Sequence, residues 1–319
     1  MNNIEFKVRV NCLTYNHSSL IMKAMDGFCM QETNFPFICV IVDDASTDGE
    51  QEVISRYLED RFDMDNKSVG CKEETDDYYH ILAQHKNNKN CFFSVYYLKY
   101  NHFSIKKTKR VYFDSAYEVK YIAMCEGDDF WIHPNKLKIQ VDYLEAHPNS
   151  SGCIHAYRRD CFQGEVVSSK EIHKYQQTVD VIPPEEVICG KGQFCATASW
   201  VYRASAVVDY PDWAKRAPVG DKPLKLVLFT RGSIGYIDEV MSVYQVGVPG
   251  SWTTRVFRDR KAEKILRQGL ISIINDFDDW TNGKYHKFVK RNLLYYKYAC
   301  WKTDFVLQPY AWLKQIIHF

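Results

Sequence analysis

Three acidic residues follow one short apolar stretch near the middle of the chain. Residues 121–125 (YIAMC) predict a buried strand, which runs into Glu126-Gly127-Asp128-Asp129 and then into a helix begun by a proline. Open α/β sheets bind ligands at the carboxyl ends of their strands, so these carboxylates belong at a ligand site. A bound Mg²⁺ or Mn²⁺ would relieve their mutual repulsion, because such ions take one or two protein carboxylates together with substrate phosphates. The two aspartates also fit a purely structural role, as helix caps or solvated loop residues.

Two further strand ends carry polar clusters. Residues 7–14 (KVRVNCLT) predict a strand that ends at Tyr15-Asn16, and residues 35–42 (FPFICVIV) predict a central parallel strand that ends at Asp43-Asp44. A helical pattern of apolar residues follows each strand. The first sixty residues therefore predict a β-loop-α-β-loop-α arrangement, which is a nucleotide-binding half-sheet.

The rest of the chain supplies more elements of the same sheet. We expect strands at 91–100, 151–159 and 194–203, and at 234–246 with a kink at Asp238-Glu239. Residues 67–90 are polar and predict an insertion or a solvated helix. A basic cluster follows the strand at 91–100, and it fits a phosphate contact and a solvated helix face equally well. Its members are Lys106, Lys107, Lys109 and Arg110.

Composition excludes several classes of protein. The 319 residues suffice for one large α/β domain, or for one smaller domain with a helical appendage. Forty-one basic and forty acidic side chains nearly balance, which argues against nucleic acid as a partner. The eleven cysteines include no Cys-x-x-Cys pair, so they predict reduced thiols and no structural zinc. Without an apolar segment before Lys7 or a spanning apolar run, we expect a cytoplasmic protein that can touch a membrane peripherally.

Taken together, the three strand ends resemble the family-2 glycosyltransferases of the GT-A fold. The resemblance lies in Thr14-Tyr15-Asn16-His17, in the acidic run 43–48, and in residues 121–131, all in the same order and spacing. It covers roughly residues 7 to 147 and continues more weakly to about residue 252. It implies a GT-A fold, with a mixed, mostly parallel central sheet flanked by helices. It also implies a sugar-nucleotide donor, most plausibly a UDP-sugar, a divalent metal and transfer to a hydroxyl with inversion.

The resemblance also assigns roles to residues at the first two strand ends. Thr14, Tyr15 and Asn16 would contact the donor, with the flat ring of Tyr15 lying against the nucleobase. Asp44 would accept a hydrogen bond from the base, and Asp43 would support the same loop. Both readings have structural alternatives, since Tyr15 fits an ordinary half-buried aromatic and either aspartate fits a helix cap.

At the third strand end, the resemblance makes Asp129 the principal metal ligand. Asp128 would approach the ribose or the metal. Glu126 stands where many relatives have Asp, and its longer side chain makes it a secondary candidate for the metal. The cation would stabilise the negative charge that builds on the departing diphosphate.

A general base is expected on the acceptor side. Asp221 follows Gly220 and precedes a proline-led helix, a position that resembles the family's base; an N-cap is the alternative role. Glu239 is a fallback base. Trp252, in a Gly-Ser-Trp turn that resembles that of relatives, would close over the diphosphate or sugar, or would simply pack on the surface.

Domain organisation follows from these assignments. We expect a catalytic domain at 1–257, divided into a nucleotide-binding half (1–130) and an acceptor half (131–257), and a helical C-terminal extension at 258–319. The aromatic and basic helix at its end fits an anionic membrane surface, and it fits equally a surface docked on the domain or on a second subunit of an oligomer.

The predicted function is metal-assisted, inverting transfer of a sugar from a UDP-sugar to a glycan or a lipid-linked acceptor, in cell-surface polysaccharide synthesis. The alternative is a non-catalytic nucleotide- or glycan-binding module, or an assembly partner, with the same fold. Metal-dependent binding of UDP distinguishes the two.

Overall fold

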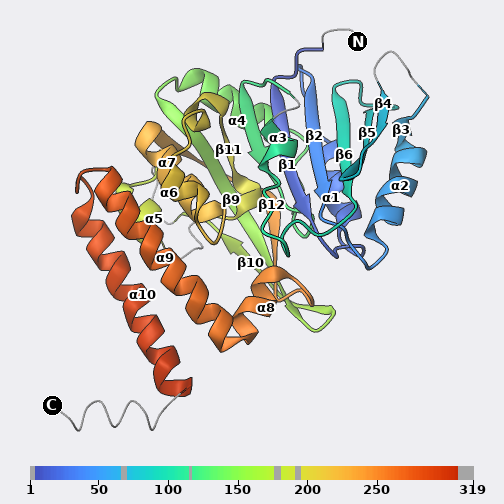
Figure 1. The fold of residues 1–319 in the computed structure, drawn as a ribbon. Coiled ribbons are helices and arrows are strands. Elements are labelled where there is room, and N and C mark those ends of the chain that lie inside the picture. Colours follow the sequence, from blue (N-terminus) through green and yellow to red (C-terminus); the bar gives the residue numbers. More distant parts are fainter. Residues whose placement is uncertain (1–3, 66–69, 115–116, 176–180, 191–194, 308–319) are drawn as a thin grey trace, which may run out of the picture.

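The computed structural model describes residues 4–65, 70–114, 117–175, 181–190 and 195–307. These residues form one mixed sheet with helices on both faces (Figure 1). The strands are β1 (Val8–Thr14), β2 (Phe37–Asp43), β3 (Phe62–Asp63), β4 (Cys71–Glu74), β5 (Tyr78–His85), β6 (Cys91–Leu98), β7 (Tyr121–Met124), β8 (Phe130–Trp131), β9 (Ser150–Gln163), β10 (Val166–His173), β11 (Val201–Arg203) and β12 (Ser233–Val246). The helices are α1 (Ile21–Cys29), α2 (Glu50–Arg61), α3 (Arg110–Asp114), α4 (Lys136–Ala146), α5 (Pro184–Cys189), α6 (Asp212–Lys215), α7 (Asp221–Arg231), α8 (Trp252–Arg258), α9 (Arg260–Trp280) and α10 (His286–Leu307).

The centre of the sheet is parallel. Strands run in the order β3-β5-β6-β2-β1-β7-β11-β9-β12-β8, and β6, β2, β1 and β7 are parallel neighbours. All seven residues of β2 are buried, because alternate side chains enter different cores on the two faces of the sheet. The predicted α/β fold with a parallel centre and C-terminal helices is confirmed.

Two layers of helices cover the sheet. The larger core lies on the face covered by α1, α2 and α4, and includes Ile21, Ile54 and Leu137. On the other face, α5 and α7 pack over the half that contains β9 and β11. Helices pack there because their apolar residues recur at helical spacing and point to one side.

Strand β11 joins the two predicted halves of the chain, because it runs antiparallel to both β7 and β9. Strand β12 follows β9 in the sheet and runs parallel to it, and its register shifts between Ile237 and Ser242, at the predicted kink. One sheet therefore continues from residues of the N-terminal half into the acceptor half.

Two sequence predictions were wrong. The polar segment within 67–90 contains β4 and β5 rather than a helix, because β5 pairs with β6 and its alternate side chains pack on the cores of the two sheet faces. Within the described part of 194–203, a single 3-10 turn at Thr197–Ser199 precedes the short β11. That turn lets Trp200 enter the core before the strand begins.

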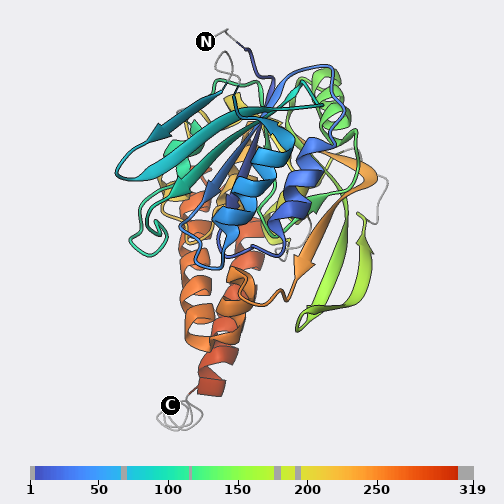
Figure 2. The ribbon, with the colours of Figure 1, turned by 90° about the vertical axis from the view of Figure 1, so that its right-hand side faces the viewer.

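The C-terminal helices form an antiparallel hairpin. Helix α9 packs against α10, and the pair shares a core with α6 and α7 through Trp213, Leu226 and Phe277. Figure 2 shows the hairpin projecting from the body of the molecule. Residues 308–319 of the predicted extension lie outside the described residues. Among the helices described, none combines the length and apolarity that a bilayer crossing needs.

Candidate functional site

A large cavity lies at the carboxyl ends of the central strands. Its volume is about 1950 Å³, and segments from across the chain form its walls. Parallel pairing places Thr14 of β1 opposite Asp43 of β2, and Asn11 opposite Met124 of β7, so the loops that follow all three strands meet at one rim. The sequence-predicted site residues among its lining are Thr14, Tyr15, Asp44, Glu126, Asp128, Asp221 and Trp252.

Neighbouring aspartates in this site point in different directions. Asp44 and Asp128 line the cavity, whereas Asp43 and Asp129 are enclosed and are not among its lining residues. Gly127 and Asp128 lie in a turn, in which the Asp129 N–H donates to the Glu126 carbonyl at 3.1 Å, so Asp128 sits on the turn while Asp129 leads into β8. The second motif therefore supplies the Asp128 carboxylate to the cavity and Asp129 to the supporting structure. In the first motif both aspartates are buried, and Asp44, which borders the cavity, is 2% exposed.

The floor of the cavity is closely packed at Gly127. Its backbone N–H donates to the Leu13 carbonyl at 3.0 Å, which ties the loop after β7 to β1. A Cβ atom at this position would lie 2.1 Å from Thr14 Oγ1, so only glycine fits. The loop that carries Glu126 and Asp128 is therefore held directly beside Thr14.

Buried Glu50 links the loops after β1 and β2. Its carboxylate accepts hydrogen bonds from the Thr14 hydroxyl, from the His17 backbone N–H at 2.8 Å and from the Ser46 hydroxyl at 2.8 Å. Burial raises the pKa of Glu50, and these hydrogen bonds oppose the rise. Sequence reasoning missed Glu50, which reads as an ordinary acidic residue in the first turn of a helix.

Asn16 and Asp43 stabilise the same pair of loops. Asn16 Oδ1 accepts from the Thr47 backbone N–H at 2.8 Å, and its own backbone N–H donates to Ser46 Oγ at 2.8 Å. Asp43 Oδ1 accepts from the Ser46 N–H at 3.0 Å and from Gln51 Nε2 at 2.5 Å. Of the predicted donor-binding residues, these two hold the loops, as expected for Asp43.

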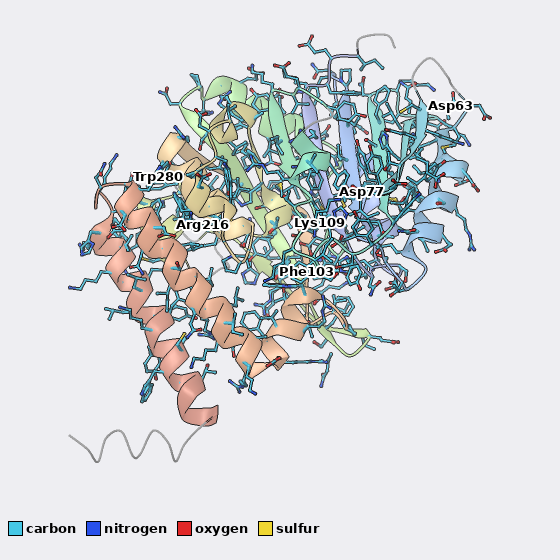
Figure 3. The ribbon with its side chains drawn as sticks, viewed as in Figure 1. Asp63, Asp77, Phe103, Lys109, Arg216 and Trp280 are labelled. Carbon is cyan, nitrogen blue, oxygen red and sulfur yellow. The ribbon has the colours of Figure 1, made fainter. Side chains whose placement is uncertain are left out.

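Asp44 is held by the loop that follows β6. Its Oδ1 accepts from the His102 N–H at 2.7 Å, and its Oδ2 accepts from the Phe103 N–H at 3.2 Å and from Lys109 Nζ at 2.9 Å. Figure 3 shows Lys109 and Phe103 close together near the middle of the view, and the lysine Nζ lies 5.6 Å from the phenyl ring centre. Lys109 of the basic cluster thus forms an ion pair, and with Arg110 it lines the cavity.

The acidic residues after β7 create a negative centre in the cavity. Glu126 and Asp128 both line it, and His17 Nε2 lies 3.7 Å from Asp128 Oδ2. Glu126 touches solvent inside the cavity, yet enclosure by the surrounding protein raises its pKa to about 8, and the charges of Asp128 and Asp221 add to the rise. A cation would be favoured here, because it would offset the repulsion among these carboxylates.

Asp129 anchors β12 beneath this centre. Its Oδ1 accepts from the Gln245 backbone N–H at 2.9 Å, and the Gln245 side-chain amide donates to the Asp128 carbonyl. Burial raises the pKa of Asp129, and the charge of Asp128 adds to the rise. Among the described residues, no three Asp, Glu, His or Cys side chains are arranged as a ready-made metal site.

Asp221 lies on the opposite wall, at the start of α7. Its Oδ2 is 3.1 Å from Lys225 Nζ, and 40% of the Asp221 side chain remains exposed while Lys225 is nearly buried. Enclosure raises the pKa of Asp221, but the adjacent lysine cations outweigh this effect, so its pKa lies below the usual value. The carboxylate is therefore ionised at neutral pH and open to the cavity. Glu239, the fallback base, is instead paired with His133 at 3.0 Å and is not among the lining residues.

The C-terminal helices complete the wall near Asp221. Leu266, Arg267 and Leu270 of α9 and Tyr295 and Tyr296 of α10 line the same cavity. Burial raises the pKa of Tyr296 to about 12, with smaller contributions from Tyr295 and Asp221. The helices thus contribute directly to the site. Lys225 was missed although it follows Asp221 by four residues on the same helix, a spacing that signals a side-chain pair. Tyr296 was missed because only the folded chain brings it to Asp221.

Comparisons with known proteins agree with this architecture. No protein-family model matches the chain. The uncharacterized protein Rv1520 of Mycobacterium tuberculosis (strain H37Rv) and the uncharacterized protein Mb1547 of Mycobacterium bovis are each 27% identical to it over 275 residues, covering 85% of this chain and 68% of theirs.

Solved structures give the fold. TarS 1-349 of S. aureus in complex with UDP-GlcNAc aligns with a TM-score of 0.55 at 15% identity, over 94% of this chain and 73% of that one. A further TarS 1-349 structure aligns with a TM-score of 0.51, and this chain covers 66% of it. The mannosyltransferase PcManGT from Pyrobaculum calidifontis, in complex with GDP-Man and Mn²⁺, aligns with a TM-score of 0.54 at 15% identity, over 97% of this chain and 76% of that one. The chain therefore shares the fold of TarS 1-349 and of PcManGT.

Proposed function

We propose that the protein is a metal-assisted, inverting glycosyltransferase of the family-2 type that uses a UDP-sugar. The observation that carries the proposal is the meeting of Tyr15, Asp44, Asp128 and Asp221 in one cavity at the carboxyl ends of β1, β2 and β7. A nucleotide-sugar site needs a surface for the nucleobase, ligands for a cation that neutralises the diphosphate, and a general base for the acceptor. Tyr15, Asp128 and Asp221 would supply these three in turn. The structural neighbours with UDP-GlcNAc and with GDP-Man and Mn²⁺ support the same class of donor and metal.

The donor would lie along the rim formed by the first two strand ends. Tyr15 is half-buried and lines the cavity, so its ring can stack on a nucleobase. Thr14 and Asn16 would act by holding the loop that presents Tyr15. Trp252, at the start of α8, lines the same cavity and would cover the diphosphate or the sugar.

Mg²⁺ or Mn²⁺ would be held at the negative centre. Asp128 is the better placed of the two predicted ligands because its side chain lines the cavity, while Asp129 would orient the loop through Gln245. Glu126 shares the cavity and becomes a second candidate ligand. When bound, the metal supplies positive charge that stabilises the leaving diphosphate.

Asp221 would be the general base. Its carboxylate is ionised and solvent-accessible in the cavity, and the neighbouring Lys225 holds it in place. It would accept the proton of the acceptor hydroxyl as that oxygen attacks the anomeric carbon. We place this reaction in the cytoplasm, on a glycan or a lipid-linked acceptor destined for a cell-surface polysaccharide.

The test measures UDP affinity and turnover separately. Asp221→Asn should leave UDP binding by calorimetry unchanged, while release of UDP from a panel of UDP-sugars falls by about 10² to 10⁴-fold, as expected on loss of a positioned base. The matched control is Asp142→Asn, which also removes a carboxylate from a lysine pair on a helix, between Lys138 and Asp142. Normal turnover in Asp221→Asn would refute its assignment. UDP binding that is indifferent to Mn²⁺ would instead favour a non-catalytic nucleotide-binding module.

A further inference from the structure

The far end of the helical hairpin carries exposed apolar side chains. Phe257 of α8 is 52% exposed, Ile265 of α9 is 69% exposed, and Tyr298 and Trp301 of α10 are 62% and 44% exposed. Exposing apolar side chains to water is unfavourable, so a group of them on one surface indicates a site that binds another protein or a membrane.

These four residues lie at the same end of the hairpin. Helix α9 ends at Trp280 and α10 begins at His286, so Ile265 precedes the turn by fifteen residues and Trp301 follows it by fifteen. Because both helices rise by the same amount per residue, Ile265 and Trp301 lie at the same level. Figures 1 and 2 show α8, the start of α9 and the end of α10 together at this end, which we call the hairpin tip.

The hairpin tip is strongly basic. Residues 252–267 and 294–307 carry eight basic and three acidic side chains, a net charge of +5, although the whole chain has a net charge of only +1. The basic residues are Arg255, Arg258, Arg260, Lys261, Lys264, Arg267, Lys297 and Lys302. Two of the acids are engaged within the tip: Asp259 caps α9 through the N–H groups of Lys261 and Ala262, and Glu263 pairs with Arg267 at 2.5 Å.

We infer that the hairpin tip docks on the surface of an anionic lipid bilayer. Aromatic and aliphatic side chains interspersed with Lys and Arg match the boundary between acyl chains and acidic headgroups. A second copy of the chain would bring an equally positive tip against this one, so charge complementarity favours lipid over self-association.

If the hairpin tip docks on a bilayer, the cavity opens towards the membrane. Arg255 and Phe257 belong to the hairpin tip and also line the cavity, as does Trp252 at the start of α8. This consequence rests on the proposed glycosyl transfer: it selects a lipid-linked acceptor over a free glycan. The docking itself depends only on the surface and is tested without turnover.

The test is sedimentation of the full chain with vesicles. We expect binding to vesicles of phosphatidylcholine and phosphatidylglycerol in equal parts, weakened by salt, and little binding to phosphatidylcholine alone. The combined change Arg258→Gln, Arg260→Gln and Lys261→Gln should lower the partition coefficient about a hundredfold, from about fivefold per charge. The matched control is Lys72→Gln, Lys89→Gln and Lys170→Gln, which removes three exposed lysines elsewhere and should change binding far less.

A second pair of variants tests the apolar contribution. Phe257→Ser with Ile265→Ser should weaken vesicle binding, whereas Val166→Ser with Ile172→Ser, equally exposed on β10, should not. Circular dichroism confirms that each variant is folded. The inference is overturned if the parent chain does not bind anionic vesicles, or if tip and control variants bind alike. It is also overturned if the parent chain self-associates without binding vesicles and the tip variants abolish that self-association, because the tip would then bind a second copy of the chain.

Discussion

The ion pair between Asp44 and Lys109 should control UDP affinity indirectly, by holding the loop 101–110 in place rather than by touching the nucleotide. Lys109 belongs to the loop 101–110, whose residues line the cavity, and its Nζ lies 2.9 Å from Asp44 Oδ2. The side chains are 3% and 13% exposed, so the pair is largely shielded from water. Breaking it should release the loop, which UDP would then have to order on binding.

The expected magnitude follows from that environment. Removing one partner of a fully buried pair costs about 3–5 kcal/mol. Here Asp44 keeps the N–H groups of His102 and Phe103, so we expect a loss nearer 2 kcal/mol, which is the range of a single charged hydrogen bond. If the whole loss appears in binding, Lys109→Met and Asp44→Asn should each weaken UDP about thirtyfold.

A double-mutant cycle measured by calorimetry tests the reasoning. Because both substitutions break the same contact, the double variant should bind UDP about as weakly as either single variant, which gives a coupling of about 2 kcal/mol. Lys107→Met is the matched control, since Lys107 lies in the same loop but pairs with Asp77 at 2.6 Å on the exposed surface. Unchanged UDP affinity in Lys109→Met, or strictly additive losses, would refute the loop-holding role and leave Asp44 as a direct contact with the base.

Three further predictions concern single residues. Tyr15→Ala should weaken UDP and free uridine alike, by about 1–3 kcal/mol for a lost stacking contact, and calorimetry in which uridine is unaffected would rule out stacking. Asp128→Ala should remove the dependence of UDP affinity on Mn²⁺, so a metal effect that persists would move the ligand role elsewhere. Lys136 is fully buried beside Trp131, and burial lowers its pKa to about 7, below the value in the unfolded chain. Between that pH and about 10.4 the unfolded chain binds the extra proton, so the free energy of unfolding should rise with pH by up to about 1.4 kcal/mol per unit. Lys136→Met should abolish this rise in denaturant titrations and stabilise the fold at pH 7 by roughly 1–4 kcal/mol; an unchanged pH slope would contradict the assignment.

Local patterns were enough to predict the central architecture. The run 35–42 has no polar residue, which fits a strand covered on both faces, and β2 is buried throughout. The ends of β1, β2 and β7 follow from where these runs stop. Since parallel strands end at one edge, the meeting of their loops at one rim could be predicted as well.

Orientation within each acidic motif was not predictable. The adjacent residues Asp128 and Asp129 have the same chemistry, and only the path of the backbone decides which carboxylate enters the cavity. The strands β4 and β5 were missed because charged residues dominate the first part of their segment. The short apolar stretch of β5, whose Ile81 and Ala83 enter the core as the strand pairs with β6, was the available signal.

Contacts between residues far apart in the sequence were the hardest features to predict. Lys109 is 65 residues from Asp44, and nothing nearby in the sequence distinguishes it from Lys107. The same holds for Tyr296, which the hairpin brings to the wall that carries Asp221. Such partners depend on tertiary packing, so no local pattern records them.

The continuity of the sheet through β11 restricts how the molecule can admit its substrates. This strand is hydrogen-bonded to β7 of the N-terminal half on one side and to β9 of the acceptor half on the other, and Gln245 of β12 holds Asp129. A clamshell closure of one half upon the other would have to break these ladders, at a cost that a ligand could not readily recover. Entry and release must therefore depend on peripheral segments such as 101–110 and α8, so turnover should respond to substitutions there more than to changes in the rigid framework between them.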